Sequence, residues 1–122
     1  MNTPSTSTAT SVQPDDLILV TGAAGFIGTI VVEALLSRGF RNLRCFVRPS
    51  SNSKRLESVL QRHKTDRVSV FRGNLLSVKD CNEAAKDAAV VYHLAAGRGE
   101  KMYADAFINS VVTTRNLLQA RR

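Results

Sequence analysis

Short apolar runs alternate along this chain with longer stretches in which apolar residues recur at helical spacing. The runs, rich in β-branched residues, predict strands over residues 17–21, 43–47, 68–71 and 89–94. The longer stretches predict helices over 26–38, 78–86 and 101–120, and one more that begins after Ser51, Asn52 or Ser53. Such alternation requires parallel pairing through right-handed crossovers. The expected fold class is therefore α/β, a doubly wound parallel sheet with strand order 3-2-1-4.

The apolar positions of these helices also predict their buried sides. On the first helix they are Ile27, Ile30, Val31, Ala34 and Leu35. On the second they are Leu56, Val59 and Leu60, and on the last they are Ala104, Phe107, Ile108, Val111 and Leu118. Gly39 is expected to end the first helix, and Ser77 with Asp80 resembles a capping box at the start of the third.

Composition divides the chain into two parts. Residues 1–16 are mostly Ser, Thr, Pro and Ala, which predicts a disordered leader, and residues 17–122 form one domain. The leader contains no Lys or Arg and no apolar core, so it resembles neither a transit peptide nor a secretory signal. No apolar run approaches the roughly 20 residues that a membrane span needs, so no membrane role is expected.

The charged and metal-binding residue types exclude several functions. The net charge of +7 is spread over the sequence without a dense basic run, so nucleic acid is an unlikely partner. A phosphate-rich ligand, or the loss of an acidic partner segment, explains the excess equally well. Two histidines are too few for a metal site, so none is expected. Cys45 and Cys81 fall within predicted elements and suit the reducing cytoplasm, the expected location.

A glycine turn follows the first predicted strand and carries the main functional signal. Gly22, Gly25 and Gly28 recur at a spacing of three, directly before the first helix. The first glycine permits a tight turn, the second lets a phosphate approach the backbone, and the third lets helix and strand pack closely. The helix N-terminus then offers N–H groups to an anion. The predicted residues of this dinucleotide-binding turn are Thr21, Gly22, Ala24, Gly25, Phe26, Ile27 and Gly28.

The segment Thr21-Gly22-x-x-Gly25-Phe26-Ile27-Gly28 resembles the extended short-chain dehydrogenase/reductase family, which includes NAD-dependent epimerases, dehydratases and dihydroflavonol-type reductases. The resemblance implies a Rossmann fold, a nicotinamide cofactor as ligand, and a role in a carbonyl reductase, epimerase or dehydratase. It covers about residues 17–120, which is nearly all of the predicted domain.

Arg48 bears on the choice of cofactor. It follows the second strand, at the place where an acidic residue would bind the adenosine ribose 2′-hydroxyl of NAD. A guanidinium suits a 2′-phosphate through its charge and its bidentate hydrogen bonds. The stretch Val47-Arg48-Pro49 also resembles the Val-Arg-Pro/Asp motif of NADP-dependent dihydroflavonol-type reductases. NADP is therefore the expected cofactor, with NAD as the alternative; Arg48 as a solvated strand-end residue stays open.

The ends of the third and fourth strands complete the predicted site. In Gly73-Asn74-Leu75, Asn74 stands where the family has Asp, so the resemblance implies an adenine contact from Asn74 and Leu75; a purely loop-shaping Asn74 stays open. Leu94, Ala95 and Ala96 match the family's segment beside the phosphates and nicotinamide ribose. His93 is interpreted as a strand-end packing residue rather than a base, and Asn116 as a structural residue that bonds helix to loop.

No catalytic residue is predicted. The family's Tyr-x-x-x-Lys unit is absent, because Ala96 follows Tyr92 by four residues and Phe107 follows Tyr103 by four. The resemblance implies that this chain corresponds to the first half of an enzyme whose catalytic half and small-molecule substrate site lie elsewhere. We expect it to bind cofactor without turnover. The alternative is a non-catalytic NADP(H)-sensing or scaffold module. An open edge on the fourth strand predicts self-association.

Overall fold

The computed structural model describes residues 11–64, 67–95 and 103–120, the last of these with side chains from residue 110 onward. Within these ranges strands and helices alternate as predicted. They are β1 (Ile18–Thr21), α2 (Phe26–Ser37), β2 (Leu43–Val47), α3 (Lys54–His63), β3 (Ser69–Arg72), α4 (Val78–Ala85), β4 (Val90–His93) and α5 (Tyr103–Ala120). Each predicted strand boundary is correct to within one residue. Residues 101 and 102, the predicted start of the last helix, lie outside the described residues.

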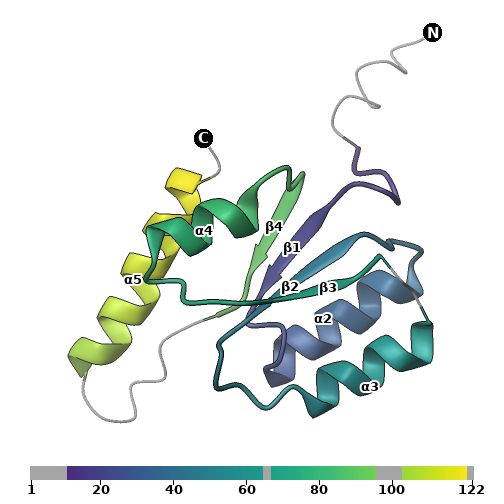
Figure 1. The fold of residues 1–122 in the computed structure, drawn as a ribbon, viewed down its shortest axis with the longest axis horizontal. Coiled ribbons are helices and arrows are strands. Elements are labelled where there is room, and N and C mark those ends of the chain that lie inside the picture. Colours follow the sequence, from purple (N-terminus) through teal and green to yellow (C-terminus); the bar gives the residue numbers. More distant parts are fainter. Residues whose placement is uncertain (1–10, 65–66, 96–102, 121–122) are drawn as a thin grey trace, which may run out of the picture.

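The described strands form one parallel sheet in the order β3-β2-β1-β4, which confirms the predicted topology. Helices α2 and α3 lie on one face of the sheet, and α4 and α5 lie on the other (Figure 1). This is a doubly wound Rossmann fold. Because all strands run in the same direction, their carboxyl ends meet at one edge, where ligands bind in this architecture.

The core has two parts, one on each face of the sheet. Alternate residues of β1 supply both: Ile18 and Val20 pack with α2 and α3, whereas Leu19 packs with α4 and α5. All four residues of β1 are buried, as expected for a central parallel strand covered on both faces. The strand that carries the glycine turn is therefore held firmly from both sides.

The predicted buried side of α2 is only partly correct, because Leu35 is buried and Val31 packs against the core but two other predicted positions are exposed. The buried positions are Gly28, Thr29, Val32, Leu35 and Leu36, while Ile27 and Ile30 are 58% and 52% exposed. The hydroxyl of Thr29 donates to the carbonyls of Gly25 (2.7 Å) and Ala23 (3.1 Å), so this polar residue belongs at the contact with the turn. Because α2 is apolar on nearly every side, periodicity did not specify its orientation. The close approach of Gly28 to the turn does.

The predicted buried side of α5 is wrong where side chains are described. Thr113, Asn116 and Leu117 are buried, whereas Val111 and Leu118 are 48% and 67% exposed. The amide of Asn116 donates to the carbonyl of Leu75 (2.9 Å), which confirms the predicted bond from helix to loop. A polar residue is stable on the inner side because it satisfies a buried carbonyl. The predicted positions 104, 107 and 108 lie outside the described side chains.

Local chemistry fixes the helix ends. Gly39, just after α2, has a φ of +93°, the conformation expected of a terminating glycine. The Ser77 hydroxyl accepts a hydrogen bond from the Asp80 backbone N–H (3.1 Å), which confirms half of the capping box. The Asp80 carboxylate accepts from the backbone N–H of Asn74 instead of that of Ser77. Arg44, on β2, donates to three carbonyls at the end of α4, those of Glu83, Ala84 and Lys86. A cation there also complements the helix dipole.

Part of the predicted leader is described. Asp15 accepts hydrogen bonds from Arg41 (2.6 Å) and Arg67 (2.8 Å), and the Asp15 carbonyl accepts one from Asn42. The Arg41 hydrogen bond lowers the pKa of the Asp15 carboxyl. Residues 1–10 lie outside the described part, and the boundary at residue 16 stays a prediction. None of the helices described has the length and apolar character to cross a membrane.

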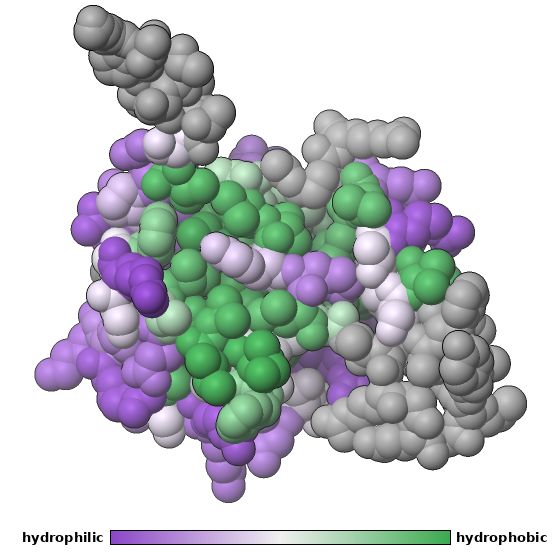
Figure 2. All heavy atoms as spheres, turned by 180° about the vertical axis from the view of Figure 1, so that it is seen from behind, coloured by the Kyte–Doolittle hydropathy of each residue, from purple (hydrophilic) through white to green (hydrophobic). Residues whose placement is uncertain are grey.

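Strand β4 pairs only with β1 among the described residues, so its other edge is open. Figure 2 shows the molecule from the side opposite to that of Figure 1, where apolar side chains gather across the middle of the surface. The edge residues Val90 to His93 include no charged residue or proline that would block pairing with another strand. Self-association through this edge stays a prediction.

Substitution of Tyr92 by lysine tests the predicted self-association through the open edge of β4. Tyr92 lies on β4 and is 40% exposed, so lysine adds a charge to the edge without opening the core. We expect sedimentation velocity to show association of the unaltered chain that grows with concentration, and Tyr92→Lys to reduce it about tenfold. Val70→Lys, on the opposite edge strand β3 and 39% exposed, is the matched control. Equal association of all three proteins would contradict the prediction.

Candidate dinucleotide site

The glycine turn packs tightly against the end of β4. Gly22 has a φ of +67°, and a Cβ there would lie 2.8 Å from the Ala95 backbone nitrogen. A Cβ on Gly28 would collide with the Gly22 carbonyl oxygen. Two of the three glycines are therefore required by backbone sterics inside the protein. Gly25 differs, because it is exposed, has an ordinary φ of −76°, and its added Cβ would meet only the Gly22 oxygen at 3.3 Å.

The N-terminus of α2 is open to an anion. Gly25 is its N-cap residue, no side chain caps the helix, and its first turn contains no acidic residue. The first amides of a helix have no partner within the helix and lie at the positive end of its dipole. Phe26 and Ile27, the first two helical residues, are exposed. The predicted turn thus provides N–H groups and space for a phosphate, with no competing carboxylate.

The sheet register brings the other predicted residues to the same edge. Thr21 pairs with Phe46 on β2 and with His93 on β4. The chain leaves β2 at Arg48, and the Gly73 amide donates to the Val47 carbonyl (3.0 Å), which brings the Asn74 loop beside it. Leu94 and Ala95 follow β4 directly, next to Gly22. Ala96 lies outside the described residues.

A partly buried hydrogen-bond network links the turn to β4. The Thr21 hydroxyl oxygen accepts from the Leu94 amide (3.0 Å) and the Ala95 amide (3.2 Å). With both acceptor positions filled, its proton is donated to Nδ1 of His93 (2.7 Å). His93 therefore carries its proton on Nε2 and donates it to the Thr114 hydroxyl (3.1 Å) on α5. Burial lowers the pKa of His93, which favours this neutral form.

Two predicted residues have side chains engaged elsewhere. The Asn74 carboxamide oxygen accepts from the Leu76 amide (2.9 Å), so it shapes its own loop, although Asn74 remains exposed. Leu75 is 7% exposed, packs in the core with α4 and α5, and its carbonyl accepts from Asn116 and from the Cys81 thiol. An adenine contact from either residue stays a prediction.

Arg48 is exposed and makes no ion pair with the described residues. Its backbone carbonyl accepts from the Ser51 amide (3.0 Å), which closes a turn just after the strand. The loop from residue 48 to Ser53 then leads into α3. A free guanidinium at the carboxyl edge of the sheet is available to an anionic ligand.

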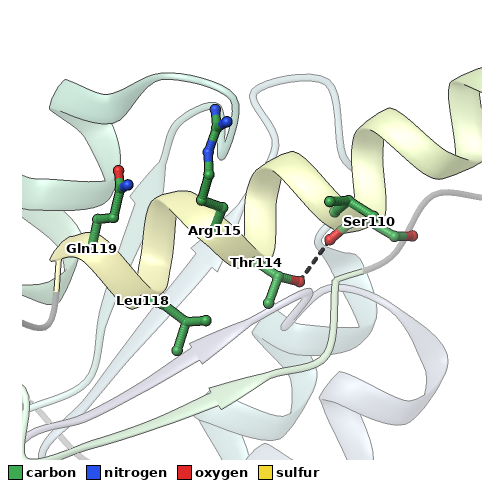
Figure 3. Close-up of a pocket in the computed structure, with 6 residues that line it drawn as sticks. Ser110, Thr114, Arg115, Leu118 and Gln119 are labelled. Atoms are coloured by element: carbon green, nitrogen blue, oxygen red, sulfur yellow. Dashed lines mark hydrogen bonds between the residues drawn. The ribbon is translucent and has the colours of Figure 1, made fainter.

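A groove of about 530 Å³ runs along the exposed side of α5, and Thr114, one of its lining residues, is the hydrogen-bond partner of His93. Figure 3 shows Arg115 and Leu118 projecting to opposite sides of the helix, with Thr114 bonded to the Ser110 carbonyl. None of the predicted cofactor residues lines the groove.

The described residues contain no cluster of three metal-ligating side chains. Cys45 and Cys81 are buried and unpaired, and burial raises the pKa of Cys45 to about 12, which makes its thiol unreactive.

Sequence reasoning missed three polar contacts. They are the Thr21–His93–Thr114 chain, the Arg44 contact with the end of α4, and a bond from Arg72 to Ser53 (2.9 Å). Each joins residues at least 19 positions apart in the sequence, so no local pattern indicates it. The predicted strand order already placed Thr21 and His93 at the same edge of the sheet, but it did not indicate that their side chains are hydrogen-bonded.

The fold and the open glycine turn are those of a Rossmann-type domain, and the comparisons identify its family. The NAD dependent epimerase/dehydratase family matches residues 18–122, and the chain belongs to that family. Dihydroflavonol 4-reductase from Solanum lycopersicum is 34% identical over 79 residues, which cover 64% of this chain and 21% of that protein. UDP-N-acetyl-alpha-D-glucosaminuronate decarboxylase from Bacillus cytotoxicus is 32% identical over 106 residues, which cover 84% of this chain and 32% of that protein.

Solved structures agree with this assignment. UDP-glucose 4-epimerase from Bifidobacterium longum, determined with NAD⁺ and UDP, is 25% identical with a TM-score of 0.72. The match covers 85% of this chain and 32% of that one. The chain thus spans about a fifth to a third of the length of the relatives described here. The predicted family and fold are confirmed.

Proposed function

We propose that this chain is the NADP-binding part of an extended short-chain dehydrogenase/reductase. One observation carries the proposal: the glycine turn leads into an uncapped helix whose first turn has no acid, beside the exposed Arg48. The helix amides suit the pyrophosphate, and the guanidinium suits a 2′-phosphate. Asn74, Leu75, Leu94 and Ala95 would surround the remaining parts of the cofactor. A cytoplasmic location is part of the proposal and is supported by the two unpaired cysteines, Cys45 and Cys81.

The parent reaction would be hydride transfer between the nicotinamide and a substrate carbon, as in a reductase, epimerase or dehydratase. This chain's contribution is to bind and orient the dinucleotide, because it contains no Tyr-x-x-x-Lys unit. The relatives include a reductase and a decarboxylase, so the substrate class is left open. A non-catalytic NADP(H)-sensing module is the alternative. Cofactor binding is expected of both the enzyme and the sensing module, so it does not distinguish them. A Tyr-x-x-x-Lys sequence encoded after residue 122 would favour the enzyme.

Charge reversal at Arg48 tests the proposed cofactor. We expect Arg48→Asp to weaken NADP⁺ binding about 100-fold, because a cation on the 2′-phosphate is replaced by an anion. Binding of NAD⁺, which has no such phosphate, should change less than about threefold. Isothermal titration calorimetry of the purified chain with both cofactors measures this. Arg62→Asp is the matched control, since Arg62 is exposed at the other end of α3. Equal losses for both cofactors would contradict the role of Arg48.

A further inference from the structure

The loop that presents Arg48 is tied to β3 at both of its ends. At its start, the Val47 carbonyl accepts from the Gly73 amide (3.0 Å). At its end, Nη2 of Arg72 donates to the hydroxyl of Ser53 (2.9 Å). Val47 and Arg72 are register partners in the sheet, so the two ties come from adjacent residues, Arg72 at the end of β3 and Gly73 directly after it.

Ser53 has an unusual role for a serine at its position. It is the N-cap residue of α3, but its side chain makes no capping bond to that helix. Its hydroxyl instead accepts from Arg72 and donates to the Glu57 carboxylate (2.7 Å). Ser53 itself is 7% exposed, whereas Arg72 and Glu57 are exposed, so this chain of hydrogen bonds is partly buried. The Ser53 hydroxyl therefore links β3 to the loop and makes no capping bond to α3.

From these contacts we propose that Arg72 is a positioning residue for cofactor selectivity. It acts through Ser53 and holds the 48–53 loop so that Arg48 faces the 2′-phosphate. The proposal rests on the proposed binding of NADP. Loss of the tether lets the loop sample other conformations, so the pre-organisation of Arg48 is lost while the rest of the site is unchanged. The consequence is weaker NADP⁺ binding with unaltered NAD⁺ binding.

Three variants and one control test the role of Arg72. Arg72→Met removes the donor, and Ser53→Ala removes the acceptor while leaving the charge of Arg72 in place. We expect each to weaken NADP⁺ binding about threefold to tenfold, with NAD⁺ binding unchanged. Arg72→Lys retains charge and a donor and should recover most of the affinity. Arg62→Met removes one positive charge at the far end of α3 and should change neither affinity. Calorimetric titration gives the affinities, and thermal unfolding confirms that each variant is folded.

The outcomes separate this inference from the proposed function. If Arg48→Asp leaves the ratio of the two affinities unchanged, the binding of NADP by Arg48 is wrong. If Arg48→Asp changes the ratio but Arg72→Met and Ser53→Ala do not, the positioning role is wrong. If Arg72→Met changes it and Ser53→Ala does not, Arg72 acts through its charge, which also overturns the tether. Should Arg72→Met fail to fold, Ser53→Ala alone decides.

Discussion

Gly28→Ala is expected to destabilise the fold by about 3 kcal/mol and to abolish dinucleotide binding. The added Cβ would collide with the Gly22 carbonyl oxygen, which belongs to the backbone and cannot rotate away. To relieve the collision, α2 must move from the turn, and the helix amides then leave the phosphate site. Chemical denaturation should show the lost free energy of unfolding, and calorimetry with NADP⁺ should show no binding.

Gly25→Ala is the matched control for this prediction. Gly25 is exposed with an ordinary φ, so alanine should cost the fold less than about 1 kcal/mol. Its methyl group would nevertheless occupy the approach of the phosphate, so binding should weaken about tenfold. The two glycines therefore separate packing from ligand access. The proposed turn would be contradicted if Gly25→Ala bound as well as the unaltered chain, or if Gly28→Ala retained full stability.

The sequence was sufficient for the fold and for the turn because both depend on local signals. Strand runs, helix periodicity and the spacing of Gly22, Gly25 and Gly28 are all readable within about ten residues. The order of the strands followed from the alternation itself, because right-handed crossovers leave few arrangements. The family could be assigned from the same short segment that the structure places at the carboxyl edge of the sheet.

The orientation of α3 was predicted correctly, because Leu56 and Val59 are buried and Leu60 packs against the core. The orientations of α2 and α5 could not be predicted in the same way. Helix α2 has apolar residues on nearly every side, so several stripes were equally consistent with burial. The buried stripe is the one that contains Gly28 and Thr29, since those residues alone permit contact with the turn. On α5, Asn116 lies inward because it binds the Leu75 carbonyl. In both helices a contact with specific backbone atoms, and not the spacing of apolar residues, determines which side is buried. The order of residues in the sequence does not indicate such contacts.

The side-chain chemistry of the site was only partly predictable. Arg48 could be found from its spacing to the turn, and the structure leaves it exposed. The Asn74 side chain, placed by resemblance on the adenine, bonds its own loop. Thr21 was expected to bind the cofactor, yet its hydroxyl is fully occupied by Leu94, Ala95 and His93. The hydroxyl therefore holds the turn and β4 together, and a cofactor contact from Thr21 stays a prediction.

Removal of the Thr21 hydroxyl should consequently impair folding strongly. We expect Thr21→Val to lower the free energy of unfolding by about 2–4 kcal/mol, because it leaves the Leu94 and Ala95 amides and the Nδ1 atom of His93 without a partner in partly buried positions. Thr21→Ser, which keeps the hydroxyl and loses one methyl group, should cost about 1 kcal/mol. Denaturant titration at pH 7.5 measures both. Equal losses in the two variants would show that packing, and not the network, accounts for the effect.

The pH dependence of stability gives an independent measure of the same network. Burial depresses the pKa of His93 in the folded protein below the ordinary histidine pKa of about 6.5. As the pH falls below that ordinary value, His93 is therefore protonated in the unfolded chain before it is protonated in the folded protein. The contribution of neutral His93 is thus complete above pH 6.5 and declines below it, towards the lower folded-state pKa. His93→Gln, which cannot be protonated at this position, should lack this decline. Identical slopes between pH 7 and pH 5 would exclude a neutral, Nε2-protonated His93 as the link between β1, β4 and α5.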